Sequence, residues 1–77
     1  MHILLVEDER RLATAVKRVM EEEGHVVDHV ADGADALAQA RSEPYDAIVL
    51  DVMLPGLNGY EVAKRLRAGG DATPILM

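Results

Sequence analysis

The sequence has 77 residues, which is enough for one small domain and too few for several. Hydrophobic residues make up 49% of it, which excludes a disordered tail, and the absence of cysteine excludes disulfides and thiol redox chemistry. The formal net charge of −6 argues against a nucleic-acid-binding surface within these residues and suits the binding of cations.

The first apolar run, residues 3–6, predicts a strand that is buried on both faces, and the acids Glu7–Glu9 follow it. From Arg10 onward the apolar residues recur with helical spacing, and Gly24 is a typical residue for the end of the helix. We expect the apolar stripe of this helix to lie in the core; it consists of Leu12, Val16, Val19 and Met20. Glu9 is interpreted as ordinary negative charge in the first turn, where the helix dipole favours it.

Residues 26–30 predict a shorter strand, which is more polar and therefore suits an edge of the sheet. Asp32-Gly33 predicts a turn into a second helix rich in small residues, and Pro44 closes that helix. The next apolar run, residues 47–50, is bounded by proline on both sides and predicts a central strand buried on both faces. It ends in Asp51, and an ionised carboxylate there is costly unless something neutralises it.

A third helix follows the loop at Pro55-Gly56, with a cap at Asn58 or Gly59 and an end at Gly69-Gly70. Residues 73–77 begin a fourth strand. Four strands alternating with three helices predict an α/β domain with a parallel sheet. The two most hydrophobic strands should be neighbours, and right-handed crossovers then give the strand order 2-1-3-4.

The acids that follow the two central strands are the candidate functional residues. Ligands in open parallel sheets bind at the carboxyl ends of the strands, where the strand order reverses. Glu7, Asp8 and Asp51 all lie at that point, so we expect three carboxylates to converge on one crevice. Their mutual repulsion is relieved by protonation or by a cation, and oxygen ligands alone favour Mg²⁺. From a rigid strand beside an open loop, Asp51 could attack a phosphoryl group to form an aspartyl phosphate.

Two stretches of the sequence carry a family resemblance. They are residues 3–9, Ile-Leu-Leu-Val-Glu-Asp-Glu, and residues 46–61, Asp-Ala-Ile-Val-Leu-Asp-Val-Met-Leu-Pro-Gly-Leu-Asn-Gly-Tyr-Glu. Both resemble the receiver domain of two-component response regulators, and the resemblance covers the whole chain in register. The motif is most similar to receivers attached to winged-helix DNA-binding domains, so only an output domain outside these residues would contact DNA.

The resemblance implies a flavodoxin-like fold and a role for each acid. Asp51 would accept the phosphoryl group from the histidine of a sensor kinase. Mg²⁺ would be bound directly by Asp8, mostly through its waters by Glu7, and also by Asp51. The backbone carbonyl of Met53 would be a further ligand, so the type of side chain at this position would matter little. Pro55 and the residues up to Gly59 would shape the loop before the third helix.

The resemblance also implies parts that these residues do not contain. Receivers have a fifth strand and two further helices, so we expect residues 1–77 to form a partial receiver domain. The family's hydroxyl residue after strand four and lysine after strand five, which touch the phosphoryl oxygens, have no counterpart up to Met77. We therefore expect weak metal binding and poor phosphorylation of this fragment.

A second hypothesis from another class is that the chain is a dimerisation or interaction piece. Without a fifth strand, the fourth strand is a bare apolar edge, and the first helix leaves an apolar patch uncovered. A phosphatase of the haloacid type is disfavoured, because it would have a second aspartate where Met53 stands. The chain also lacks the glycine patterns that cradle nucleotide phosphates.

The remaining features carry weaker expectations. His2, His25 and His29 are interpreted as surface or edge residues, because none has a second ligand at a suitable spacing. No apolar stretch reaches the roughly 18 residues of a membrane span. A strand directly after Met1 leaves no room for a signal peptide, so we expect a cytoplasmic protein without a membrane partner.

Overall fold

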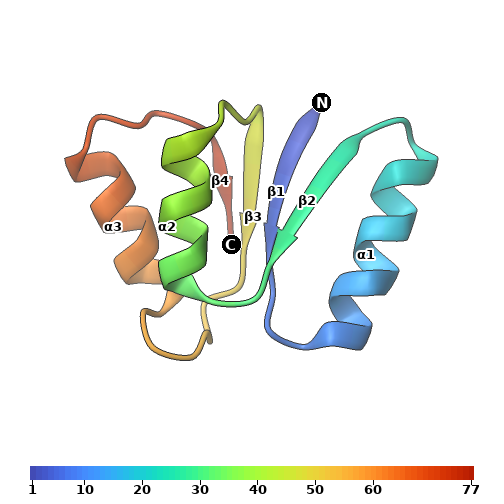
Figure 1. Ribbon diagram of the computed structural model, residues 1–77, viewed down its shortest axis with the longest axis horizontal. Helices are drawn as coiled ribbons and strands as arrows, with labels where there is room; N and C mark the ends of the chain where they lie inside the picture. Colours follow the sequence, from blue (N-terminus) through green and yellow to red (C-terminus); the bar gives the residue numbers. More distant parts are fainter.

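The chain forms a four-stranded parallel sheet with the order β2-β1-β3-β4 in a computed structural model that describes all 77 residues (Figure 1). The sequence predicts this order. The strands are β1 (His2–Val6), β2 (Val26–Val30), β3 (Ala47–Leu50) and β4 (Ile75–Leu76). The polar strand β2 lies at one edge, as expected, and the short strand β4 lies at the other.

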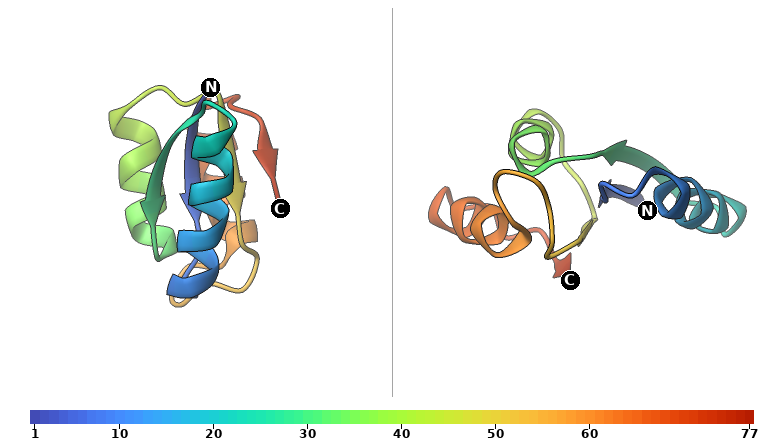
Figure 2. Two further views of the ribbon diagram at one scale, coloured as in Figure 1. Left: turned by 90° about the vertical axis from the view of Figure 1, so that its right-hand side faces the viewer. Right: turned by 90° about the horizontal axis from the view of Figure 1, so that it is seen from below.

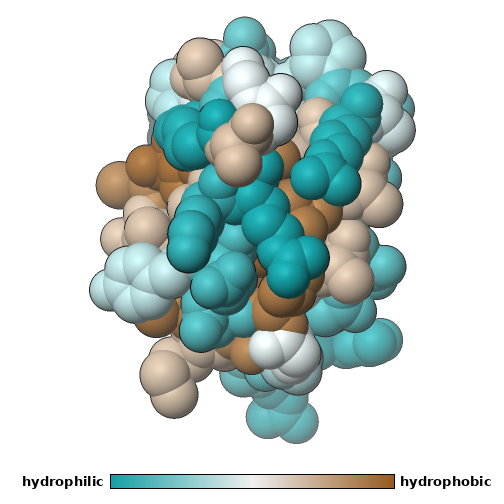
Figure 3. Space-filling model, turned by 90° about the vertical axis from the view of Figure 1, so that its left-hand side faces the viewer, coloured by the Kyte–Doolittle hydropathy of each residue, from teal (hydrophilic) through white to brown (hydrophobic).

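Three helices connect the strands and lie on two sides of the sheet. They are α1 (Arg10–Glu22), α2 (Gly33–Ser42) and α3 (Gly59–Ala68). α1 lies over β1 and β2 on one face, whereas α2 and α3 pack against each other on the opposite face (Figure 2). The side of the molecule that α3 forms carries mostly hydrophilic side chains, with hydrophobic ones visible between and beside them (Figure 3). Each helix therefore has one face on the sheet and one in water.

Each helix begins at a residue whose side chain accepts hydrogen bonds from the first turn. Asp32 has this role for α2 and Asn58 for α3. At α1 the capping residue is Glu9, whose carboxylate accepts from the backbone N–H groups of Arg11 and Leu12. The interpretation of Glu9 as ordinary first-turn charge is therefore wrong, because Glu9 precedes the helix and satisfies two of its free N–H groups.

The main hydrophobic core lies between the sheet and the pair α2–α3. It contains 11 buried residues. Among them are Val6 and Leu50, the residues that directly precede Glu7 and Asp51, and both are 1% exposed. Leu66 of α3 packs in the same core. Close packing of this kind fixes the ends of β1 and β3 relative to each other, and so it fixes the acids that follow them.

The opposite face of the sheet is only partly covered. Under α1 lies a smaller cluster made of Ile3, Leu5, Ala13 and Val27. In β3 the side chains of Ile48 and Leu50 are buried, but Ala47 and Val49 are partly exposed. The prediction that this strand is buried on both faces is therefore wrong. The physical reason is that α1 lies over β1 and β2, so β3 has a helical cover on one face only.

The apolar stripe of α1 is more exposed than the sequence predicts. Leu12 and Val19 are 50% and 60% exposed, and Ala13 is the one fully buried residue of the helix. Val16 and Met20 pack against the smaller core cluster but keep part of their surface in water. The prediction that the whole stripe lies in the core is therefore wrong, because Leu12 and Val19 do not pack against the sheet. An apolar patch on this helix was expected, and the structure has one.

The edge strand β4 is short and exposed. Only Ile48↔Ile75 and Val49↔Leu76 pair it with β3. The side chains of Leu76 and Met77 are exposed, as expected for a bare apolar edge. Among the helices, none combines the length and the apolar character that crossing a bilayer requires.

Candidate functional site

The strand register brings the acids together at the carboxyl ends of β1 and β3. Val6 pairs with Leu50, and the backbone N–H of Asp51 donates to the carbonyl of Val6 at 3.0 Å. Glu7 and Asp51 therefore follow adjacent strands side by side, at the carboxyl ends of β1 and β3, which lie at the lower edge of the sheet in Figure 1. One carboxylate oxygen each from Glu7, Asp8 and Asp51 lies within 4.8 Å of the others. The structure thus places three of the predicted site residues in one cluster.

The crowding of these carboxylates changes the acidity of Glu7. Partial burial is the largest cause that raises the pKa of its carboxyl group above the ordinary value. A hydrogen bond shared with the Asp51 side chain and repulsion from Asp51 and Asp8 raise the pKa further, against a hydrogen bond from the backbone N–H of Glu9 that lowers it. No cationic group is among the causes that shift the pKa of Glu7, so a bound cation would relieve the repulsion between the ionised carboxylates.

Met53 contributes to the cluster through its backbone. Its N–H donates to Asp51 Oδ1 at 3.1 Å, which orients the carboxylate. Its side chain is 81% exposed and points into water, in keeping with the expectation that the side-chain type matters little here. The role of its carbonyl oxygen as a metal ligand stays a prediction.

Gly59 brings the start of α3 against the backbone that follows β3. A Cβ atom at this position would lie 2.9 Å from the Cα of Val52 and would overlap the carbonyl oxygen of Asp51. The N–H of Gly59 donates to the carbonyl of Val52 at 2.9 Å. Only glycine allows this approach, so Gly59 lets the start of α3 pack against the backbone of Asp51 and Val52 and hold it in place. The sequence marked Gly59 only as a cap or loop residue.

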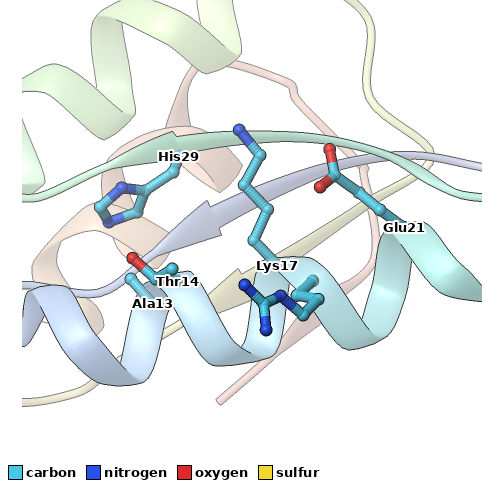
Figure 4. Close-up of a pocket in the computed structure, with 6 residues that line it drawn as sticks. Ala13, Thr14, Lys17, Glu21 and His29 are labelled. Atoms are coloured by element: carbon cyan, nitrogen blue, oxygen red, sulfur yellow. The ribbon is translucent and has the colours of Figure 1, made fainter.

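Four hollows indent the surface, and one of them includes acids of the cluster in its lining. A crevice of about 280 Å³ is lined by Glu7 and Asp51 together with apolar side chains of β1, α1, β3 and the segment at β4. A polar groove of about 360 Å³ lies between α1 and β2 and contains Lys17, Arg18 and His29 (Figure 4). None of the three clustered carboxylates lines that groove, so the crevice is the hollow that belongs to the candidate site.

Sequence reasoning missed a second cluster, at the opposite end of the sheet. His2 was interpreted as a residue without a partner, but its Nε2 lies 2.8 Å from Asp28 Oδ2 and 3.9 Å from Glu43 Oε2. The buried Tyr45 donates its hydroxyl to Asp28 as well, at 2.7 Å. Spacing along the chain could not reveal this cluster, because it forms only when β1 and β2 pair. His29 is also engaged, with Nε2 2.7 Å from the carbonyl of Glu7.

The donor set of the first cluster suits a hard divalent cation. It consists of carboxylate oxygens, with no imidazole among the three ligand groups. Mg²⁺ prefers such ligands, keeps several waters and commonly shares a phosphate with the protein. A carboxylate on a rigid strand end beside such an ion is also placed to react as a nucleophile toward phosphorus. Fold and site together therefore define a parallel α/β domain with a candidate cation site at the carboxyl ends of its two central strands.

The chain belongs to the response regulator receiver domain family, which matches residues 3–77. It is 52% identical over 77 residues to the transcriptional regulatory protein TcrA of Mycobacterium tuberculosis, covering 100% of this chain and 30% of that protein. Over 76 residues it is 46% identical to the transcriptional activator protein IrlR of Burkholderia pseudomallei, covering 99% of this chain and 33% of that protein. The chain spans about a third of the length of these curated relatives.

Solved receiver domains share the fold. The receiver domain of a Francisella response regulator superposes with a TM-score of 0.94 at 34% identity, covering 96% of this chain and 61% of that one. The receiver domain of the sensor histidine kinase PA1611 from Pseudomonas aeruginosa, with a magnesium ion coordinated in its active site cleft, gives 0.91 at 39% identity, covering 96% and 62%. These comparisons confirm the family and the flavodoxin-like parallel sheet that the sequence predicts.

Proposed function

We propose that Asp51 is the phosphoacceptor of this receiver domain and takes its phosphoryl group from a phosphohistidine of a sensor kinase. The observation that carries the proposal is the meeting of Glu7, Asp8 and Asp51 at the ends of β1 and β3. In the transfer, an oxygen of Asp51 forms a bond to phosphorus while the bond from phosphorus to the histidine nitrogen breaks. The freed imidazole takes up a proton.

Asp51 is the best nucleophile among the three acids for structural reasons. Its backbone is fixed by the hydrogen bond to β1, and its Oδ1 is oriented by the N–H of Met53. Glu7 carries the raised pKa, and its carboxylate also accepts from the N–H of Glu9. Asp8 is exposed and lies in the loop before α1 rather than next to a strand end. A positioned carboxylate loses less freedom in reaching the transition state.

The same residues fit a magnesium ion. Asp8 and Asp51 would bind it directly, Glu7 mostly through its waters, and Met53 through the backbone carbonyl. Bound there, Mg²⁺ supplies positive charge for the phosphoryl oxygens during transfer. The receiver of PA1611 with its magnesium ion supports this proposal, as does the response regulator TrrA of Thermotoga maritima, solved in complex with Mg²⁺ and BeF. TrrA matches with a TM-score of 0.91 at 35% identity, covering 96% of this chain and 64% of that one.

The wider role follows from the relatives, which are transcriptional regulators much longer than this chain. We infer that phosphorylation of this domain controls an output domain that binds DNA, and that the domain itself acts on no separate substrate. A winged-helix output and a cytoplasmic location stay predictions.

Phosphotransfer from an autophosphorylated sensor kinase, followed by intact-mass measurement, tests the proposal. The full-length protein should gain about 80 Da, the mass of one phosphoryl group on a carboxylate, in the presence of Mg²⁺ and not with EDTA. Asp51→Asn should abolish the gain. Asp46→Asn is the matched control, because Asp46 is exposed at the other end of the same strand. A gain that persists in Asp51→Asn contradicts the proposal.

Self-association through β4 is a second candidate function. The exposed side chains of Leu76 and Met77 at a free strand edge favour it. Light scattering over a range of concentrations should then show an oligomer that Met77→Lys dissociates. A chain that stays a folded monomer at all concentrations rules out this candidate and leaves the phosphoacceptor role untouched.

A further inference from the structure

A second group of metal-ligating side chains lies at the other end of the sheet from the phosphoacceptor candidate. His2 belongs to β1, Asp28 to β2, and Glu43 follows α2. One ligand atom of each lies within 4.8 Å of the other two. β1 runs between the two clusters (Figure 1), and its five residues separate them by roughly 16 Å. The group is therefore distinct from the acids at the carboxyl ends.

The distances between these ligand atoms suit a small tetrahedral ion. His2 Nε2 lies 2.8 Å from Asp28 Oδ2 and 3.9 Å from Glu43 Oε2. In a tetrahedral zinc site with bonds of about 2.1 Å, neighbouring ligand atoms are about 3.4 Å apart. The observed separations lie on either side of this value. The side chains of Asp28 and Glu43 are 38% and 48% exposed, so both have room to rotate toward a bound ion.

The imidazole of His2 is already held in one orientation. Its ring lies against the ring of the buried Tyr45, with centroids 4.4 Å apart and an angle of 42° between the planes. The backbone N–H of His2 donates to Asp46 Oδ2 at 2.7 Å, which anchors the start of β1. A ligand that is ordered before the ion arrives loses little freedom on binding.

The carboxylate of Asp28 is oriented by a chain of hydrogen bonds behind it. The Tyr45 hydroxyl donates to Asp28 Oδ2 at 2.7 Å, and Gln39 Nε2 donates to the Tyr45 hydroxyl at 2.8 Å. In metal sites, ligating carboxylates and histidines are commonly fixed by outer partners of this kind. The hydroxyl of the buried Tyr45 thus has a partner on each side, as buried tyrosine hydroxyls usually require.

Charge and ligand chemistry indicate which ion fits. Two carboxylates and a neutral imidazole carry a charge of −2, which a divalent cation balances. One imidazole nitrogen with two carboxylate oxygens suits Zn²⁺, whereas Mg²⁺ prefers an all-oxygen set such as that at the carboxyl ends. We propose that His2, Asp28 and Glu43 bind a zinc ion that joins β1, β2 and the segment after α2.

Titration of the full chain with ZnCl₂ in saturating MgCl₂ tests this proposal. NMR spectra should show the ring signals of His2 shifting at one equivalent of Zn²⁺, while those of His25 and His29 stay in place. This measurement on the unmutated chain does not depend on the folding of any variant. Unmoved His2 signals, or a response centred on His25 and the N-terminal amine 3.1 Å from its Nδ1, overturn the proposal.

Calorimetry on variants gives the second readout. His2→Gln and Asp28→Asn should each lower the zinc affinity at least tenfold. Tyr45→Phe should lower it to a similar extent, because it frees the Asp28 carboxylate. Asp8→Asn is the control: it removes an acid at the other end of the sheet, so the zinc affinity should not change. Equal affinity of His2→Gln and the unmutated chain, or loss of binding with Asp8→Asn, contradicts the assignment.

Discussion

Replacing Glu7 by glutamine should stabilise the metal-free fold and weaken magnesium binding at the same time. The carboxylates of Glu7, Asp8 and Asp51 lie within 4.8 Å of one another. Two unit charges at that distance in water repel by about 0.9 kcal/mol, and salt screening reduces this at a partly exposed site. Glu7→Gln should therefore raise the free energy of unfolding by about 0.5–1 kcal/mol in EDTA at pH 7.

The effect on magnesium has the opposite sign. A divalent cation about 5 Å from the Glu7 carboxylate gains roughly 1.7 kcal/mol from it in a water-like dielectric. Loss of that charge should weaken the affinity by a factor of roughly 15–20. Glu22→Gln is the matched control, because it removes one charge from an exposed site at the far end of α1. Its magnesium affinity should stay within twofold of that of the unmutated chain.

The pH dependence of the stability provides an independent test of the repulsion at Glu7. The pKa of Glu7 in the folded chain lies above its ordinary value of 4.5. Folding is therefore favoured by protonated Glu7 below pH 4.5, and this contribution is lost as the pH rises through the raised pKa. Urea unfolding followed by circular dichroism should show this loss in the unmutated chain and not in Glu7→Gln. A Glu7→Gln variant that is less stable in EDTA, or that binds magnesium as well as before, refutes the reasoning.

Three further predictions concern the framework of the site. Gly59→Ala should destabilise the fold by about 1–3 kcal/mol and slow phosphorylation, because its Cβ meets the backbone after Asp51; Gly69→Ala, whose Cβ stays 3.5 Å from its nearest neighbour, should do neither. Leu66→Ala should lower the free energy of unfolding in urea by about 2–5 kcal/mol, whereas Val19→Ala, at an exposed position, should change it by no more than about 0.5 kcal/mol. Equal losses of stability would contradict the placement of the main core between the sheet and the pair α2–α3. Hydrogen bonds from the Tyr45 hydroxyl and His2 lower the pKa of Asp28, so the stability that ionised Asp28 gives should be lost as the pH falls below 3.8. Asp28→Asn should remove this acid-induced loss of stability from acid-unfolding curves. A curve for Asp28→Asn that matches that of the unmutated chain contradicts the prediction.

The order of the strands and the meeting of the acids could be predicted because both depend on short patterns. Unbroken apolar runs mark the central strands, and right-handed crossovers leave one arrangement for the rest. An acid directly after each central strand then reaches the same edge of the sheet. Glu7 and Asp51 are neighbours for that reason, and the register Val6↔Leu50 shows it.

The features that the sequence did not reveal depend on contacts across the fold. The exposure of Val19 and Val49 depends on how far α1 extends over the sheet, and periodicity carries no information about cover. The contact of His2 with Asp28 joins residues 26 positions apart, and it forms only because β1 pairs with β2. The close approach of Gly59 to the backbone of Asp51 depends on the path of the loop between them.

The most direct test of the central claim locates the phosphoryl group. After phosphorylation with Mg²⁺, reduction by borohydride converts an aspartyl phosphate to homoserine, and tandem mass spectrometry of peptides identifies the position. We expect homoserine at position 51 and unmodified aspartate at position 8. Homoserine at Asp8 or elsewhere, with Asp51 intact, would contradict it.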